Sequence, residues 1–346
     1  MTHPEPQAIL APITEAAMFL TLTVEPGGET VVRDLLPDVS GLRRSVGFRI
    51  PEARLTCVTG IGSALWDRLF GSPRPASLHP FRELRGPRHR APSTPGDLLF
   101  HLRAHRLDLC FELARLIVER LDGAATVVDE IHGFRSFDQR DVLGFVDGTE
   151  NPEGAAARDA VLIGDEDPSF AGGGYVVVQK YLHDLAAWNA LSVEDQEAAI
   201  GRTKLDDVEY PDERKAPSSH LALNVIEGPD GEQRQILRHN MPFGRVGAAE
   251  YGTFFIGYAA DPAVTEQMLE NMFLGSPRGT TDRILDFSTA VTGALFFVPS
   301  AELLDDPPAA PAGAADEATT AAAVAQEPPS PSDGSLAIGG LGDDRP

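Results

Sequence analysis

The chain has 346 residues, 42% of them hydrophobic, a length that favours two domains with buried cores. Its 52 acidic residues outnumber 29 basic ones, and the resulting net charge of -23 opposes binding to phosphate backbones and argues against nucleic acid as a partner. No segment approaches the ~20 apolar residues of a membrane span, and the first residues lack the pattern of a signal peptide, so we expect a soluble, cytoplasmic protein.

The first half of the chain alternates strand and helix patterns. Apolar and polar residues alternate in a manner typical of strands at residues 16–24, 55–61 and 95–103. Residues 107–121 place apolar side chains at helical spacing. Cys57 and Cys110 lie in apolar contexts, and we expect both to be buried free thiols rather than a disulfide or metal pair.

A glycine-rich, proline-ended loop follows at residues 144–152, Gly-Phe-Val-Asp-Gly-Thr-Glu-Asn-Pro. Gly144 and Gly148 permit backbone angles that other residues avoid, and the residue before Pro152 favours an extended or turn conformation. Such a loop presents Asp147 in a fixed position. Two interpretations remain open at this point, since Asp also caps turns without any catalytic role.

The second half repeats the mixture of strands and helices. We expect strands at 173–182 and 252–260, a short helix at 184–190, and a helix at 262–273 that begins with a proline. Two successive sets of about 140 residues predict a duplicated α+β unit, with the boundary between Ile131 and Leu143.

Three motifs in this half carry a family resemblance. They are the loop at 144–152, the Ser-Ser-His segment at 218–220, and Leu-Arg-His-Asn-Met-Pro-Phe-Gly at 237–244. Together they resemble the dye-decolorising peroxidase family of haem enzymes, in particular its bacterial B-type branch. The likeness extends from about residue 15 to residue 300 and is strongest between residues 144 and 297.

The resemblance implies a fold, a cofactor and an activity. It implies two ferredoxin-like domains with antiparallel sheets and peripheral helices, at residues 8–138 and 139–304, with one haem b in the C-terminal domain. It also implies a peroxidase that reduces hydrogen peroxide and oxidises dyes, phenolics or similar reductants. The alternatives are a haem-handling or iron-releasing protein similar to deferrochelatases, and a non-catalytic cargo protein.

His220 is the expected axial ligand of the haem iron. Neutral imidazole suits iron, and His220 ends a Pro-Ser-Ser loop and enters an apolar run. His239 lies between Arg238 and Asn240 and would point away from what they face. The remaining histidines have charged, turn or terminal neighbours and are expected at the surface: His3, His79, His89, His101, His105, His132 and His183. By resemblance Asp282 is the partner of His220; a helix-capping role for Asp282 is the alternative.

We expect Asp147, Arg238 and Asn240 on the opposite, open face of the haem. Alternation places Arg238 and Asn240 on one side if their segment is a strand. Arg238 can stabilise developing negative charge and contact the cofactor, Asn240 can orient peroxide or water, and Asp147 can move a proton. Arg202 is a candidate partner for a haem propionate.

The C-terminal tail differs in composition from the rest. Residues 305–332 consist almost entirely of Pro, Ala, Asp, Glu, Thr and Ser, which predicts a disordered linker. Within residues 333–346, the aliphatic residues Leu336, Ile338 and Leu341 are spaced by glycines, and the segment resembles the peptides that load cargo enzymes into encapsulin shells. Chance aliphatics in a disordered tail are the alternative. We expect a homo-oligomer packaged in such a nanocompartment.

Overall fold

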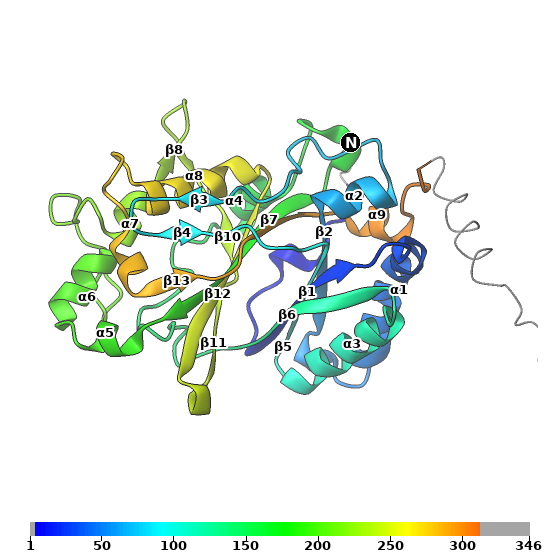
Figure 1. Ribbon diagram of the computed structural model, residues 1–346, viewed down its shortest axis with the longest axis horizontal. Helices are drawn as coiled ribbons and strands as arrows, with labels where there is room; N and C mark the ends of the chain where they lie inside the picture. The colour runs from blue at the N-terminus through cyan, green and yellow to red at the C-terminus, as the bar shows by residue number, and fades with distance from the viewer. Residues whose placement is uncertain (1–3, 312–346) are drawn as a thin grey trace, which may run out of the picture. The chain divides into compact units, whose positions relative to one another are not determined.

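The computed structural model describes residues 4–311, and its centre is an antiparallel sheet of ten strands (Figure 1). The main path of the sheet runs β10-β12-β7-β14-β2-β5-β1-β6, while β11 pairs with β12 and β13 pairs with β7. Helices pack on this sheet, so the chain has an α+β fold, as expected. The segment 333–346, which was predicted to be a targeting peptide with Leu336, Ile338 and Leu341 as anchors, lies outside the described residues.

The first half contributes four strands and the helices that cover them. The strands are β1 (Ala16–Val24), β2 (Thr56–Gly62), β5 (Leu98–Ala104) and β6 (Ala125–Phe134), and the main helices are α1 (Glu29–Gly47) and α3 (Leu107–Arg120). The predicted strands and the predicted helix at 107–121 are confirmed within a few residues. Helix α1 was not predicted. It buries Val32, Leu35, Leu36 and Val39, which recur at helical spacing.

The second half supplies the other six strands of the sheet. They are β7 (Gly174–His183), β10 (Leu237–Arg238), β11 (Met241–Arg245), β12 (Glu250–Ala259), β13 (Ser288–Ala290) and β14 (Ala294–Val298). The helices that matter for the site are α5 (Leu185–Asn189), α6 (Val193–Ile200), α7 (His220–Asn224) and α8 (Pro262–Leu274). The predicted strands β7 and β12 and the predicted helices α5 and α8 are confirmed.

Short elements complete the described chain. They are α2 (Ser63–Leu69), α4 (Gly154–Val161), α9 (Ala301–Asp305), the strand pairs β3 (Leu84–Arg85) with β4 (Arg90–Ala91) and β8 (Ile226–Glu227) with β9 (Gln233–Arg234), and 3-10 turns at Ala8–Leu10, Pro51–Ala53, Pro168–Phe170, Val246–Ala248 and Arg283–Asp286. None of the helices within residues 4–311 combines the length and the apolar character needed to cross a membrane.

The two halves share one sheet because β14 pairs with β2, through Phe296 opposite Gly62 and Phe297 opposite Ile61. Both phenylalanines are fully buried, and burial of a large apolar side chain contributes about 1.5–3 kcal/mol to stability. Cys57 and Cys110 are free and buried, as predicted, and burial raises the pKa of each thiol to about 12.

Two predictions about the histidines are wrong, and the first concerns His101. His101 was expected at the surface, but its ring is fully buried in the central strand β5. Strands β1 and β2 flank β5 on either side, and its residues are buried on both faces. A polar residue in such a strand has no route to solvent and needs a buried partner, which His101 finds in the hydroxyl of Tyr258 at 2.8 Å from its Nδ1.

Candidate functional site

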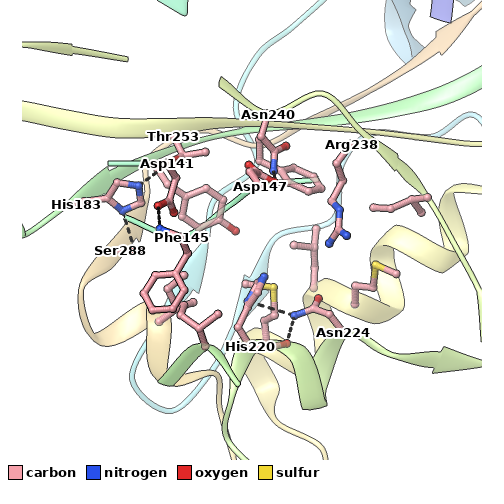
Figure 2. Close-up of a pocket in the computed structure, with 18 of the residues that line it drawn as sticks. Asp141, Phe145, Asp147, His183, His220, Asn224, Arg238, Asn240, Thr253 and Ser288 are labelled. Atoms are coloured by element: carbon pink, nitrogen blue, oxygen red, sulfur yellow. Dashed lines mark hydrogen bonds between the residues drawn. The ribbon is translucent and has the colours of Figure 1, made fainter. Parts of the chain in front are cut away.

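A cavity with about 930 Å³ of space free of atoms, part of it open to solvent, lies in the second half of the chain. Its walls come from β7, β12, α7, α8 and the loop before α4 (Figure 2). Most of the lining is apolar, including Phe145, Ile200, Ile236, Phe255, Met268, Leu269, Met272 and Ile284. His220 and Asn224 lie on one side of the cavity, and Asp147, Arg238 and Asn240 lie on the other (Figure 2).

The loop at 144–152 holds Asp147 as the sequence indicates. Gly144 and Gly148 have φ values of +94° and +86°, which are strained for any residue with a side chain. The backbone N–H of Asp147 donates to the carbonyl of Gln139 at 2.9 Å. The Asp147 carboxylate faces the cavity and accepts a hydrogen bond of 3.3 Å from Nδ2 of Asn240.

Asn151, at the end of the same loop, fixes the position of Arg238. Its Nδ2 donates to the backbone carbonyl of Arg238 at 2.7 Å, and its Oδ1 accepts from the backbone N–H of Arg238 at 2.9 Å. The loop that carries Asp147 is therefore bound directly to the strand that carries Arg238. The sequence marked Asn151 only as part of a turn.

The alternation predicted for residues 236–241 is confirmed. Arg238 and Asn240 line the cavity, whereas the ring of His239 is buried away from it, with 4% of its surface exposed. Asn240 Oδ1 accepts from the backbone N–H of Ile256 at 3.0 Å. Because this bond occupies the oxygen, the amide nitrogen of Asn240 is the atom that faces Asp147.

His220 is the first residue of α7, which Ser219 caps through a 3.4 Å hydrogen bond from the N–H of Ala222. The Nδ1 atom of His220 donates to Oδ2 of Asp282 at 2.7 Å, and Asp282 is fully buried. The other oxygen of Asp282 accepts from the N–H of Ile284 at 3.0 Å. Asp282 thus combines the two roles that the sequence left as alternatives, helix cap and histidine partner.

This hydrogen bond leaves Nε2 of His220 with its lone pair. A histidine whose Nδ1–H is held by a carboxylate has a fixed ring orientation and a more basic Nε2, the usual arrangement for a metal ligand. His220 itself is about a quarter exposed, toward the cavity that it lines. The site therefore places the imidazole of His220 opposite a carboxylate, a guanidinium and a carboxamide, across a mainly apolar space.

Arg202 does not line the cavity. It is buried and forms ion pairs with Glu150 (Nη2 to Oε1, 3.3 Å) and Asp207 (Nε to Oδ1, 3.2 Å), and it donates to the hydroxyl of Thr149. The structure thus places it behind the loop that carries Asp147. Its role as a propionate partner stays a prediction.

Sequence reasoning missed several polar residues of the cavity, among them the ionisable His183 and Asp141. His183 was expected at the surface, but it lines the cavity, and its ring bonds to Ser288 Oγ at 2.7 Å and Thr253 Oγ1 at 2.9 Å (Figure 2). Burial lowers the pKa of His183 to about 4, so its ring is neutral near pH 7. The sequence could have indicated this position, because side chains alternate along a strand and His183 therefore lies on the same face of β7 as Tyr181.

Asp141 is the second missed residue. Its Oδ1 accepts from the N–H of Phe145 at 3.0 Å, and it lines the same cavity as Asp147. Burial, with a further contribution from the nearby charge of Asp147, raises the pKa of Asp141 to about 7. Its position only six residues before Asp147 could have indicated that it lies near the same cavity.

The raised pKa of Asp141 predicts a dependence of stability on pH. An exposed Asp has a pKa of ~3.9, so the folded protein binds the proton of Asp141 more tightly than the unfolded chain does. The neutral acid therefore stabilises the fold fully below about pH 4, and this stabilisation is lost as the pH rises to about 7. Asp141→Asn keeps the acceptor for Phe145 and cannot ionise. In urea unfolding, its free energy of unfolding should therefore fall less between pH 4 and pH 7 than that of the parent.

Asp138→Asn is the control for this prediction. Asp138 is exposed, and its hydrogen bond to Arg140 lowers its pKa, so its stabilising contribution is lost as the pH falls rather than as it rises. Removing the Asp138 carboxylate should leave the change in the free energy of unfolding between pH 4 and pH 7 close to that of the parent. Parallel pH profiles for Asp141→Asn and the parent would contradict the prediction.

Comparison with known proteins gives a consistent result over the whole described chain. A family model described as Dyp-type peroxidase, N-terminal, matches residues 6–135, and one described as Dyp-type peroxidase, C-terminal, matches residues 138–303. A dye-decolorizing peroxidase of Rhodococcus erythropolis is 62% identical over 336 residues, which cover 97% of this chain and 96% of the relative.

Solved structures agree. The encapsulated DyP-type peroxidase from Mycobacterium smegmatis superposes with a TM-score of 0.88 at 64% identity, covering 89% of this chain and 100% of that one. DyPB from Rhodococcus jostii gives a TM-score of 0.86 at 57% identity, covering 88% and 99%. Variants of the Rhodococcus jostii protein have been solved in complex with heme.

Proposed function

The chain belongs to the dye-decolorising peroxidase family, and from this premise we propose that its cavity holds one haem b with His220 as the axial ligand and Asp147, Arg238 and Asn240 on the opposite face. The protein is a peroxidase that reduces hydrogen peroxide while oxidising dyes, phenolics or similar reductants. The observation that carries the site assignment is the bond from His220 Nδ1 to the buried Asp282, which leaves Nε2 free.

The residues present fit a haem. The cavity that would hold the haem has about 930 Å³ of space free of atoms, part of it open to solvent. Its walls are mainly apolar, as a porphyrin requires, and its polar groups are gathered on opposite sides. Nε of Arg238 is buried without a hydrogen-bond partner within residues 4–311. Buried donors are normally paired, so this suits an arginine whose partner is a bound ligand.

Bound haem would supply a redox-active iron, at which hydrogen peroxide would be reduced and the reducing substrate would be oxidised. The chain's own residues manage protons and charge. Asp147 can take a proton from one oxygen of hydrogen peroxide and return it to the other, which leaves as water. Asn240 holds the Asp147 carboxylate through the 3.3 Å hydrogen bond. Arg238 stabilises the negative charge that develops as the O–O bond breaks.

One experiment tests the proposed function. The absorption spectrum of the purified protein is recorded before and after a stoichiometric addition of hydrogen peroxide. We expect a Soret band that shifts on addition of peroxide and returns when a dye is added and bleached. A protein that takes up no haem would overturn the proposal, whereas haem uptake without peroxide reactivity would favour a haem-handling role.

We further propose the domain arrangement that the family resemblance implies. It consists of ferredoxin-like domains at residues 8–138 and 139–304, with the haem in the second. Every residue that lines the cavity lies between Asp141 and Ser288, which supports a haem site built by the second domain alone. The antiparallel pairing throughout the sheet is compatible with two such units.

The C-terminal segment is the proposed targeting element, joined by the linker at residues 305–332. The relative from Mycobacterium smegmatis is an encapsulated peroxidase, which supports the same packaging here. The cytoplasmic location and the homo-oligomer stay predictions. We propose that Leu336, Ile338 and Leu341 bind an apolar groove on the inner face of an encapsulin shell.

Removal of residues 333–346 should abolish co-purification with a co-expressed shell protein, because it deletes all three proposed anchors. The measurement is the ratio of peroxidase to shell protein in assembled particles. Deletion of a segment of the same length from the linker is the matched control and should leave loading intact. Unchanged loading after loss of the anchors would show that another surface of the protein binds the shell.

A further inference from the structure

The buried side of the segment that carries Arg238 and Asn240 contains a contact between the two halves of the chain. The ring of His239 faces away from the cavity, and its Nδ1 lies 2.9 Å from Nη1 of Arg103. Arg103 belongs to β5 in the first half and is 1% exposed. This hydrogen bond joins a central strand of the first half to the residue between the two cavity-facing side chains.

Arg103 is an unusual buried cation. Within residues 4–311 no carboxylate lies within ion-pair distance of it; its other partners are the backbone carbonyls of Ala11, at 2.8 Å from Nη1, and of Ala8. A buried charge costs free energy unless hydrogen bonds compensate it. Arg103 thus forms no salt bridge among the described residues. Its two terminal nitrogens donate all the hydrogen bonds that it makes, whereas its Nε is buried without a partner within residues 4–311.

The chemistry of this contact fixes the state of His239. Arginine has donors only, so Nδ1 of His239 must accept, and the ring must be the neutral tautomer that carries its proton on Nε2. Burial and the Arg103 charge both lower the pKa of His239 well below its ordinary value. The ring is therefore held in one orientation.

Side chains complete the backbone hydrogen bonding between the segment around His239 and strand β12. The N–H of His239 donates to the carbonyl of Ile256 at 3.1 Å, but the N–H of Ile256 donates to the side chain of Asn240 at 3.0 Å. In a regular antiparallel ladder both bonds of such a pair would be made by the backbone. Since one ladder bond is replaced, the ring of His239 and the amide of Asn240 become the anchors of this segment, one on each face.

We propose that Arg103 is a positioning residue for Arg238 and Asn240, acting through His239. Without the hydrogen bond to Arg103, the ring of His239 would no longer hold the backbone at residue 239 in place. The neighbouring residues Arg238 and Asn240 would then be less well positioned. The inference rests on the proposed function of these two residues. Its consequence is that the first half sets the geometry of the haem face opposite His220, although none of its described residues lines the cavity.

Fluoride binding to the ferric haem protein tests this without turnover, because an anion at the open face reports the donors that reach it. We expect Arg103→Met and His239→Leu each to raise the Kd for fluoride about 10-fold, and the double variant to raise it no further than the larger single effect. His239→Gln offers an oxygen acceptor to Arg103 and should stay within about 2-fold of the parent.

Gln7→Met is the matched control. Gln7 is also buried and polar, and it joins Thr59 to Pro299 through hydrogen bonds of 2.9 Å and 3.0 Å from its Nε2, away from the cavity. Its loss should lower the thermal midpoint and leave the Kd for fluoride unchanged. An equal effect of Gln7→Met and Arg103→Met on this Kd would show a merely structural role and overturn the proposal.

The remaining outcomes separate this inference from the proposed function. If Arg238→Leu weakens fluoride binding and Arg103→Met does not, Arg103 is not a positioning residue. If Arg238→Leu itself has no effect, the assignment of the open face is wrong and the positioning proposal falls with it. Should Arg103→Met fail to fold, the contrast between His239→Leu and His239→Gln decides the question, since equal Kd values for these two overturn the proposal.

Discussion

His220→Ala is expected to yield a protein that no longer holds haem in its native ligation state. The substitution removes the imidazole and leaves the capping hydroxyl of Ser219 in place, so α7 should still begin at the same residue. The fully buried Asp282 then loses its 2.7 Å partner. We expect a Soret band that is reduced and displaced, measured together with the iron content of the purified protein.

Two further measurements make the His220 result specific. Added imidazole should enter the space left by the ring and restore the native band, because the remaining site still provides Asp282 as its acceptor. His220→Ala combined with Asp282→Asn removes the unpaired buried carboxylate and should recover stability without recovering the spectrum. An unchanged spectrum in His220→Ala would mean that another residue binds the iron.

Asp147→Ala and Arg238→Leu should both retain haem, and at least one should slow the reaction with peroxide by ~10²-fold or more. Neither substitution touches the bond between His220 and Asp282, so ligation persists. Asp147→Ala removes the proposed proton carrier, and Arg238→Leu removes the fixed positive charge. The measurement is the stopped-flow rate of the Soret change after mixing with peroxide.

The dependence of these rates on pH distinguishes the two roles. Loss of an acid-base group should remove a titration from the rate profile, whereas loss of a permanent charge should lower the rate at every pH. Arg234→Leu is the matched control, since Arg234 is an exposed arginine of the hairpin formed by β8 and β9. Parental rates in both Asp147→Ala and Arg238→Leu would remove the assignment of the open face.

Much of this architecture could be predicted from local patterns. The strands at 16–24 and 252–260 and the helix at 262–273 carry clear periodicity, and the motifs around Asp147, His220 and Arg238 belong to one family. The alternation of Arg238, His239 and Asn240 followed from strand geometry alone. These features depend on neighbours in sequence, which a single chain displays directly.

The errors concern residues whose environment is set by distant parts of the chain. His101 was expected at the surface on the basis of charged or turn neighbours in the sequence, yet it is buried, as is Arg103 two residues further on. Each finds its hydrogen-bond partner in the second half, in Tyr258 and His239 respectively. No local pattern encodes such a pairing between residues that lie far apart in the chain.

The contact between Asn151 and Arg238 also protects the sheet. β10 is the last strand on its side of the ten-stranded path, so the outward backbone groups of Arg238 would form an exposed edge open to pairing with a strand of another molecule. The Asn151 side chain supplies one donor and one acceptor to these same groups, as a neighbouring strand would. The loop that presents Asp147 thereby takes the place of a neighbouring strand over one residue, and it covers a sheet edge beside the cavity that would otherwise be open to pairing with another molecule.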